Sequence, residues 1–494
     1  MVDSETRQPK RILILGAGIA GLSAAYRLRK AVPDAQISLW EKANRVGGVI
    51  ETVERDGMQF EQSADNFMTL VPTALDLCAE LGLTDSLVRT NTSDRRTYVA
   101  RRGKLHPLPD GFMMLAPTKL WPMVTTPLLS PFGKVRAGME LLLPRKSDDA
   151  DETIAAFARR RLGREVFERI VEPLLSGIYA GDAEKISLMA TLPRFRDLEE
   201  KHRSLIIAMT LGQKEAKKAK RAEESGARYS MFVTLREGLA HLPQRIAETL
   251  PKGTITLNRA ASKVERIRGE QQHNEQQHEE QQREIWRVTD TTGQSECFDA
   301  LVCALPSPVA GALFVESVPP AADFYDRMEQ TSCAVVTFAF RHEQIKNDFR
   351  GMGFVVPTIE GGSLVAGSFS SHKYPHRAPE GIALIRIFTG GARAPEVAEM
   401  DPETLKRKVF GEIQPLLKID GEPQTVEVAR WRRGMPQYHL GHLERLAALD
   451  AALSQIPSLA LCGNSFTGVG IPACIKSGSD AAEKIAAFCR TREY

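Results

Sequence analysis

Apolar and polar positions at the start of the chain predict a strand, a helix and a second strand. Residues 11–15, "RILIL", form an apolar run that ends at a glycine, as in a buried strand of a parallel sheet. Helical spacing follows over residues 22–31 and stops before Pro33, and residues 35–42, "AQISLWEK", form the second strand. Such a β-α-β unit requires a right-handed crossover. The beginning of the chain therefore predicts an α/β domain.

Alternation with a period of two predicts two hairpins. Residues 49–63 alternate on both sides of an Asp56-Gly57 turn, and residues 95–109 alternate around Gly103. A helix is expected between them.

The rest of the chain divides between helices and a second sheet. Residues 112–227 are apolar and broken by prolines, or amphipathic with helical spacing, which predicts a helical insertion. Four alternating segments between 330 and 390 predict an antiparallel sheet, and an amphipathic helix follows at 402–418. The last elements are a strand, "LALCGN", a glycine-rich loop and a helix.

Composition and charge are those of an ordinary globular protein. The chain has 494 residues, of which 43% are hydrophobic and 26% charged, so two or three domains are expected. A net charge of +3 gives no reason to expect a nucleic-acid partner. The seven cysteines include no C-x-x-C pair, which argues against a disulfide framework or zinc knuckle and favours a reducing cytoplasm. Neither a signal peptide nor a spanning helix is expected, and surface contact with a membrane stays open.

One tract is of low complexity. Residues 270–283, "EQQHNEQQHEEQQR", repeat Glu-Gln-Gln-His approximately three times between two strand-like segments, and we interpret them as a disordered hairpin extension. Two histidines in such a tract do not make a metal site, and no metal is expected.

The first chemical signal is "GAGIAG", a G-x-G-x-x-G motif between a strand and a helix. Gly16 permits the tight turn, Gly18 lets the backbone approach a pyrophosphate, and Gly21 permits close packing of helix and strand. The second strand ends at Glu41, whose carboxylate suits the ribose hydroxyls of an adenosine and repels a 2′-phosphate. A plain glycine turn is the alternative. The predicted dinucleotide contacts here are Gly16, Ala17, Gly18, Ile19, Ala20, Gly21 and Glu41.

The residues that follow narrow the cofactor. "EKANRVGG" places Arg45, Gly47 and Gly48 just after the acid. This E-x-x-x-R-x-G-G extension resembles the flavoprotein family of amine oxidases, phytoene desaturases and porphyrinogen oxidases. The resemblance implies FAD as the cofactor, with Arg45 and the two glycines near its pyrophosphate and ribityl chain. It further implies FAD contacts from Lys42, Val49, Val264, Trp431, Gly463, Val469, Gly470 and Ile471.

A second glycine-rich loop lies near the C-terminus, in "GNSFTGVGIPACIKSG" at 463–478. In the resembling family, the last strand, loop and helix return to the sheet beside the flavin. The start of the last helix would then face the ribityl chain or flavin ring and stabilise negative charge on the reduced flavin. The two loops are thus expected to hold two ends of one ligand, and a structural turn is the alternative.

Three stretches, at 172–195, 430–442 and 463–478, closely resemble the porphyrinogen oxidases of heme synthesis. The resemblance implies oxidation of protoporphyrinogen IX or coproporphyrinogen III with FAD and O2, releasing H2O2. Residues 62–66, "QSADN", replace the usual glycine-proline turn of that family.

The substrate contacts are less specific. Arg95 and Arg96 are candidates for pairing with substrate propionates, or else solvated surface arginines. Tyr179 fits packing and substrate contact equally, and no catalytic acid or base stands out. The runner-up functions are a carotenoid desaturase, an amine oxidase, or a non-enzymatic binder with the same fold.

The expected fold class is α/β, with a Rossmann-like FAD-binding domain, an antiparallel-sheet substrate domain and a helical insertion. The expected segments are 11–85, 228–308 and 425–494 for the FAD-binding domain, 86–111 and 309–424 for the substrate domain, and 112–227 for the helical domain. A cytoplasmic protein is expected, with peripheral contact at the inner face of the membrane, hand-over to a ferrochelatase, and a homodimer as open partner expectations.

Overall fold

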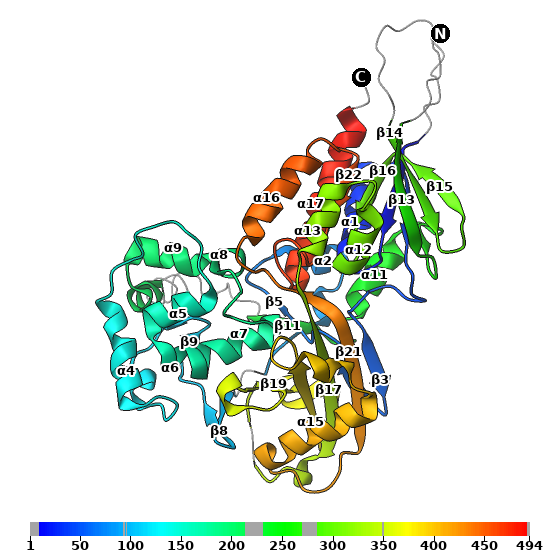
Figure 1. Ribbon diagram of the computed structural model, residues 1–494. Coiled ribbons are helices and arrows are strands. Elements are labelled where there is room, and N and C mark those ends of the chain that lie inside the picture. The colour runs from blue at the N-terminus through cyan, green and yellow to red at the C-terminus, as the bar shows by residue number, and fades with distance from the viewer. Residues whose placement is uncertain are drawn as a thin grey trace, which may run out of the picture.

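The computed structural model describes residues 9–91, 94, 96–212, 231–268, 284–347 and 350–491. Figure 1 shows a sheet with helices near both ends of the chain, a group of helices, and a large sheet covered by α15 (Pro402–Leu417). The tract predicted at 270–283 and Arg95 lie outside the described residues. Within the described ranges, no helix is both long and apolar enough to span a membrane.

Five parallel strands form the sheet near the chain ends, in the order β12-β2-β1-β16-β22. The strand predicted at 11–15 is confirmed and is central, with a neighbour on each side. Because helices or further strands cover both faces of this sheet, Ile12, Leu13 and Ile14 are all fully buried. The strands are β1 (Arg11–Leu15), β2 (Gln36–Trp40), β12 (Ile255–Thr256), β16 (Ala300–Cys303) and β22 (Leu459–Leu461).

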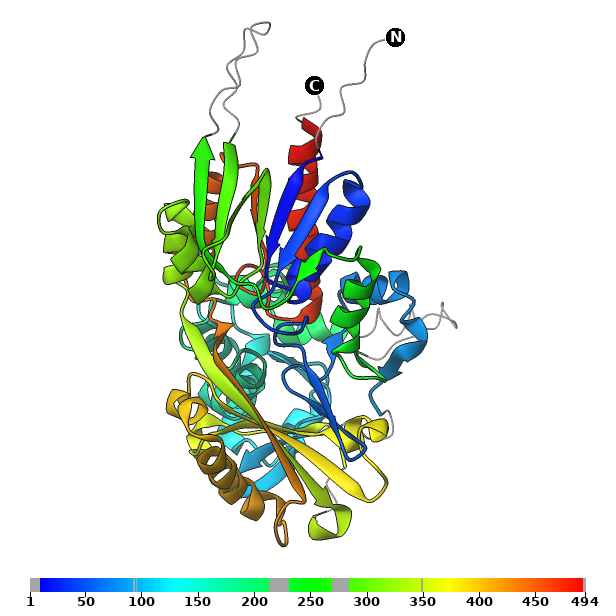
Figure 2. The same ribbon diagram turned by 90° about the vertical axis from the view of Figure 1, so that its right-hand side faces the viewer.

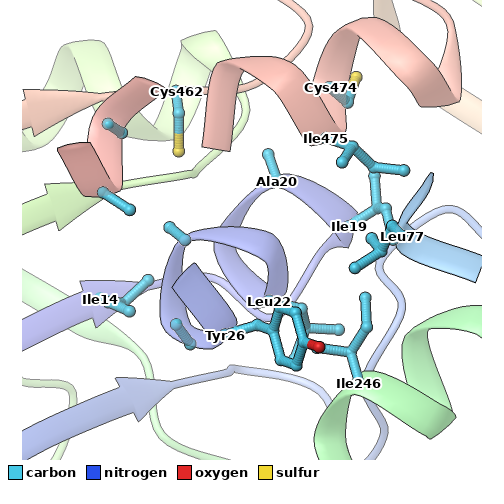
Figure 3. Packing of buried hydrophobic residues seen from close by; sticks show 14 of the residues in the cluster. Ile14, Ile19, Ala20, Leu22, Tyr26, Leu77, Ile246, Cys462, Cys474 and Ile475 are labelled. Atoms are coloured by element: carbon cyan, nitrogen blue, oxygen red, sulfur yellow. The ribbon is translucent and has the colours of Figure 1, made fainter. Parts of the chain in front are cut away.

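Two helices from opposite ends of the chain pack together on one face of this sheet. They are α1 (Ile19–Ala31) and α17 (Ile471–Thr491). A Cβ atom at Gly478 of α17 would collide with the carbonyl oxygen of Ala20 in α1, so glycine is required for this approach. Figure 3 shows the same core, in which α1 also packs against α2 (Thr73–Glu80) and α11 (His241–Thr249).

The other face of the five-stranded sheet is covered by helices and a three-stranded sheet (Figure 2). Leu13 and Leu15 share a core with Phe314 and Phe324, which belong to α12 and α13. This core therefore extends past the boundary expected at residue 308. The covering elements are α12 (Ser307–Phe314), α13 (Pro319–Asp326), α16 (His442–Leu453), β13 (Ala261–Arg268), β14 (Glu284–Asp290) and β15 (Ser295–Phe298).

A seven-stranded sheet has the order β21-β17-β20-β19-β18-β7-β8. Its pairs are antiparallel except β18 with β7, whose parallel pairing is possible because a long stretch of chain, rather than a hairpin, connects them. β21 belongs to this sheet, which thus extends beyond the boundary expected at residue 424. The strands are β7 (Thr97–Arg101), β8 (Lys104–Pro107), β17 (Gln330–Arg341), β18 (Gly353–Val355), β19 (Leu364–Phe369), β20 (Ile382–Gly390) and β21 (Thr425–Pro436).

The helical insertion is confirmed within the described part of 112–227. Its core surrounds a buried ion pair between Arg161 and Glu140, and Glu199 lies beside them. The helices are α3 (Trp121–Thr125), α4 (Pro131–Gly138), α5 (Ile154–Leu162), α6 (Arg164–Val166), α7 (Glu172–Tyr179), α8 (Leu188–Thr191) and α9 (Pro193–His202). A short β9 (Phe112–Met113) and β10 (Ala116–Pro117) precede them.

The hairpin predicted around Asp56-Gly57 is confirmed. β3 (Thr52–Arg55) pairs with β4 (Met58–Glu61), and both turn residues have positive φ, 51° and 71°. This conformation fits the twist of a two-residue hairpin, which is why Asp-Gly is favoured there. Nearby, β5 (Phe67–Met68), β11 (Phe232–Leu235) and β6 (Leu87–Arg89) form a small sheet.

Candidate functional site

The two glycine-rich loops lie at the same edge of the five-stranded sheet. β1 and β22 run parallel on either side of β16, and each is followed by its loop and then by α1 or α17. Because parallel strands end at one edge, the N-termini of both helices lie there too. Free amide groups and the helix dipole at such ends favour an anionic ligand.

The three glycines of the first loop differ in what surrounds them. A Cβ at Gly16 would lie 3.0 Å from the carbonyl oxygen of Ala304, and one at Gly21 would collide with the carbonyl of Gly16. At Gly18, by contrast, a Cβ would meet no protein atom within 4 Å. Packing within the protein thus explains Gly16 and Gly21, whereas Gly18 faces open space. This arrangement fits a pyrophosphate placed against Gly18.

Glu41 lies directly beside this loop. Its Oε2 accepts a hydrogen bond from the amide of Ala17 at 2.7 Å, and its Oε1 accepts one from the amide of Ala43 at 2.8 Å. A carboxylate can accept further bonds, so the buried Glu41 retains capacity for ribose hydroxyls. Lys42, which follows, is exposed.

The segment after Glu41 folds back onto the first loop. Gly47 donates its amide hydrogen to the carbonyl of Ala17 at 2.8 Å, and a Cβ at Gly48 would lie 3.2 Å from the Cα of Gly18. Arg45 bonds the carboxylate of Glu51 at 2.8 Å and the carbonyl of Gly48 at 2.9 Å. Arg45 therefore shapes this loop, which brings its glycines to the expected pyrophosphate position. Val49 is exposed beside them.

The C-terminal loop is held by the motif at 430–442. Tyr438 donates its hydroxyl hydrogen to the carbonyl of Asn464, and His442 Nε2 lies 2.7 Å from the carbonyl oxygen of Phe466. Burial lowers the pKa of His442, so the neutral ring donates from Nε2. The stretches 430–442 and 463–478, which the sequence analysis singled out, therefore contact each other directly.

Four residues of the C-terminal loop are expected to contact the cofactor, and they lie at its two ends. Gly463 has a φ of 130°, donates its amide hydrogen to Ser477 Oγ at 3.0 Å, and has open space where a Cβ would be. Val469 and the exposed Gly470 immediately precede Ile471, the first residue of α17. This placement fits a ligand contacting the helix N-terminus.

A series of contacts connects the C-terminal loop with the N-terminal one. Asn464 Nδ2 donates to the carbonyl of Gly434 at 3.4 Å, close to Trp431 on the same strand. Trp431 Nε1 donates to the carbonyl of Gln62 at 2.8 Å, and Gln62 donates its amide hydrogen to the carbonyl of Glu51 at 2.9 Å. Trp431 thus lies where the large sheet meets both loops.

The remaining predicted residues lie in different surroundings. Val264 is buried on β13, an edge strand, and packs in the core with Trp286. Arg96 is exposed and forms an ion pair with Asp94. Tyr179 is half-buried, its hydroxyl lies 3.5 Å from the carbonyl of Thr191, and burial raises its pKa to about 12.

The sequence did not predict a buried cluster of charges that surrounds Asp65, within residues 62–66. The carboxylate of Asp65 lies 3.2 Å from Lys373 Nζ, 3.4 Å from Arg377 Nη1 and 3.3 Å from Arg386 Nη1. No spacing pattern connects these positions in the sequence. The one available signal was the departure of "QSADN" from the usual family turn.

Comparisons with known proteins find relatives along nearly the whole chain. The chain matches the family described as flavin containing amine oxidoreductase over residues 19–486. It is 35% identical to the coproporphyrinogen III oxidase of Bacillus subtilis, covering 96% of this chain and 97% of that protein. It is 25% identical to protoporphyrinogen oxidase 2 of Arabidopsis thaliana, covering 97% and 94%.

A solved structure has the same fold over nearly the whole chain. The crystal structure of a protein from Exiguobacterium sp. 255-15 superposes with a TM-score of 0.82 at 29% identity, covering 97% of this chain and 99% of that one. The protein is thus an FAD-dependent oxidoreductase. With two glycine loops suited to one long ligand and a match along most of its length, the chain belongs to the flavin-containing amine oxidoreductase family.

Proposed function

We propose that this protein oxidises a porphyrinogen to the porphyrin in heme biosynthesis, with coproporphyrinogen III favoured over protoporphyrinogen IX. The observation that carries this proposal is the 35% identity with a coproporphyrinogen III oxidase over 97% of its length. The lower identity with the protoporphyrinogen oxidase of Arabidopsis thaliana, 25%, favours the coproporphyrinogen.

The reaction removes six hydrogens from the macrocycle. Bound FAD supplies hydride acceptance, and O2 takes the electrons afterwards, so one porphyrinogen and three O2 give one porphyrin and three H2O2. This protein's share of the work is placement, because a hydride transfer needs the two partners in contact and correctly oriented. The loops at Gly18 and Gly463 hold the cofactor, and Trp431 fixes the junction with the substrate sheet.

The proposal is tested by following porphyrin fluorescence in aerobic solution. Purified protein is mixed with each porphyrinogen at equal concentration, and H2O2 is measured in parallel. We expect fluorescence to grow faster with coproporphyrinogen III than with protoporphyrinogen IX, with H2O2 at three per porphyrin, and equal or reversed rates would contradict the preference. FAD-bearing protein that gives no fluorescence with either substrate would contradict the proposal and favour a desaturase or an amine oxidase.

We further propose that the protein is cytoplasmic and makes peripheral contact with the inner face of the membrane through α3 and α4. Trp121 is 74% exposed and Phe132 90% exposed, and Val135 and Met139 continue the exposed face of Phe132 at helical spacing. Glu140, the acidic residue between 119 and 146, is buried and paired with Arg161. Exposed aromatic side chains beside a basic residue of α4, Lys134, suit an anionic lipid surface. Figure 1 shows α4 at the outer end of the helical region.

Sedimentation with vesicles tests this contact. Wild-type protein should bind vesicles containing phosphatidylglycerol more than pure phosphatidylcholine, and Trp121→Ser with Phe132→Ser should weaken the binding. Val315→Ser is the matched control, since Val315 is 61% exposed on another part of the molecule. Equal binding by wild type and the double variant would contradict the contact. Hand-over to a ferrochelatase and a homodimer stay predictions from the resemblance.

A further inference from the structure

A cluster of buried charges lies between the β3–β4 hairpin and the seven-stranded sheet. It contains Asp65, Lys373, Arg377 and Arg386, with Glu61 beside them. The side chains of Arg377 and Arg386 are 0% and 1% exposed. Charges this deeply buried are expensive unless they are paired.

The cluster has more positive than negative charge. Burial opposes ionisation of Asp65, but Lys373, Arg386 and Arg377 outweigh it and hold its pKa well below the usual range. Burial raises the pKa of Glu61, and burial lowers the pKa of Lys373 against the opposing attraction of Asp65. Arginine stays protonated in proteins. Three basic side chains, two arginines and a lysine, thus face two carboxylates, those of Asp65 and Glu61, and the basic groups outnumber the acidic ones.

The hydrogen bonding within the cluster is also incomplete. Among the described residues, Nε of Arg377 and both Nε and Nη1 of Arg386 have no hydrogen-bond acceptor in geometry, although Nη1 of Arg386 is within ion-pair distance of Asp65. The protein therefore supplies fewer hydrogen-bond acceptors than these two guanidinium groups have N–H donors. Their positive potential extends into the surrounding low-dielectric interior.

Arg377 and Arg386 donate hydrogen bonds to the backbone of the segment that contacts Trp431. Arg386 Nη2 donates to the carbonyl of Glu61 at 2.9 Å and to that of Ser63 at 2.6 Å, and Arg377 Nη2 donates to the carbonyl of Asp65 at 2.6 Å. Gln62, between them, accepts the indole hydrogen bond of Trp431. The cluster therefore lies immediately behind the segment that connects the two cofactor loops to the large sheet.

We propose that this cluster raises the reduction potential of the bound flavin by placing excess positive charge beside it, and that Asp65 limits the size of this effect. The inference rests on the proposed function and on the FAD contact that the resemblance implies for Trp431, the residue that donates to the Gln62 carbonyl. Reduction adds negative charge to the flavin, which a fixed positive potential in a low-dielectric interior stabilises. Asp65 and Arg386 are positioning residues in this account, because neither is placed in contact with the substrate.

The test measures the flavin potential of the purified holoenzyme against reference dyes. Asp65→Asn removes negative charge and should raise the potential, whereas Arg386→Gln removes positive charge and should lower it. Arg386→Lys keeps the charge and should restore the wild-type value. Shifts of the same sign in Asp65→Asn and Arg386→Gln, or no shift in either, would overturn the inference, since looser packing alone gives no opposite signs.

Two controls separate this inference from general instability and from the proposed function. Arg161→Met disrupts a buried ion pair in the helical region and should lower stability without changing the potential. If Arg386→Gln loses its FAD, Lys373→Met provides a second loss of positive charge and must lower the potential. Wild-type protein that purifies without FAD would contradict the flavin site itself, whereas an active holoenzyme without opposite shifts contradicts this inference alone.

Discussion

The indole Nε1 of Trp431 donates a hydrogen bond of 2.8 Å to the carbonyl oxygen of Gln62, a residue 369 positions earlier in the chain. Trp431 belongs to the seven-stranded sheet and Gln62 follows the β3–β4 hairpin. This bond therefore connects the seven-stranded sheet to the loop region of the five-stranded sheet. Together with the contacts of Arg386, it fixes the backbone of residues 61–63 from the side of the large sheet.

Replacing Trp431 with phenylalanine should weaken this connection. The ring volume is largely kept, but the Gln62 carbonyl loses its donor, and an unsatisfied buried acceptor costs about 1–3 kcal/mol. We expect a lower unfolding midpoint in urea and a several-fold lower kcat. The flavin absorption spectrum and kcat report the local change, and Trp286→Phe is the control, because Trp286 is buried in the core away from this bond. Unchanged kcat in Trp431→Phe would contradict the role given to this residue.

Gly18→Val should abolish FAD binding without unfolding the protein. A Cβ at this position meets no protein atom within 4 Å, and the φ of −69° is accessible to valine, so we expect the added side chain to occupy the space of the cofactor. FAD content is measured by absorbance near 450 nm after gel filtration. Gly138→Val is the matched control, since Gly138 also faces open space, at a φ of −64°, but in the helical region. Stoichiometric FAD in Gly18→Val would show that this assignment is wrong.

The tract between β13 and β14 should be dispensable. Arg268 and Glu284 are directly paired across the two strands, so a two-residue Asn-Gly turn can join them in place of residues 269–283. Lengthening a surface connection costs little closure entropy, and shortening it should change stability little. We expect the same unfolding midpoint and turnover as in the wild type. A large loss of turnover in folded protein would reveal a role for the tract.

The double variant Arg95→Ala with Arg96→Ala should raise KM for the porphyrinogen. Arg96 is exposed and already paired with Asp94. Its contribution to the free energy of substrate binding is therefore that of a surface ion pair, about 0–1 kcal/mol. For the two together we expect an increase in KM of about tenfold, or 1.4 kcal/mol, with kcat little changed. Asp94→Asn leaves the cations in place and serves as the control. An unchanged KM would identify both arginines as solvated surface residues.

Stability should fall as the pH is lowered from about 6.5 to about 4, in part because of His376. Burial, with Arg377 nearby, lowers the pKa of His376 to about 4, whereas the unfolded chain binds this proton near the ordinary value of 6.5. Between these values the unfolded state holds more protons, so the free energy of unfolding decreases as the pH falls, and above 6.5 this contribution is constant. Urea titrations at several pH values should give a shallower decline for His376→Gln. Identical slopes for both proteins would contradict this assignment.

Much of the local structure follows from the sequence. The run "RILIL" is β1, the Asp56-Gly57 turn closes β3 and β4, and the amphipathic segment at 402–418 is α15. These elements are set by side-chain periodicity and turn chemistry, which act over a few residues. The first glycine loop could be recognised from the sequence as well, because Gly16, Gly18 and Gly21 follow a strand and open a helix.

The tertiary structure alone decided which distant residues meet. No spacing in the sequence relates Asp65 to Lys373, Arg377 and Arg386, or Trp431 to Gln62, because these contacts depend on how two sheets dock. The parallel pairing of β18 with β7 has the same origin. The sequence by itself determined the elements and the cofactor motif, since both are local. The burial of these charges arises only when the sheets exclude water from around them.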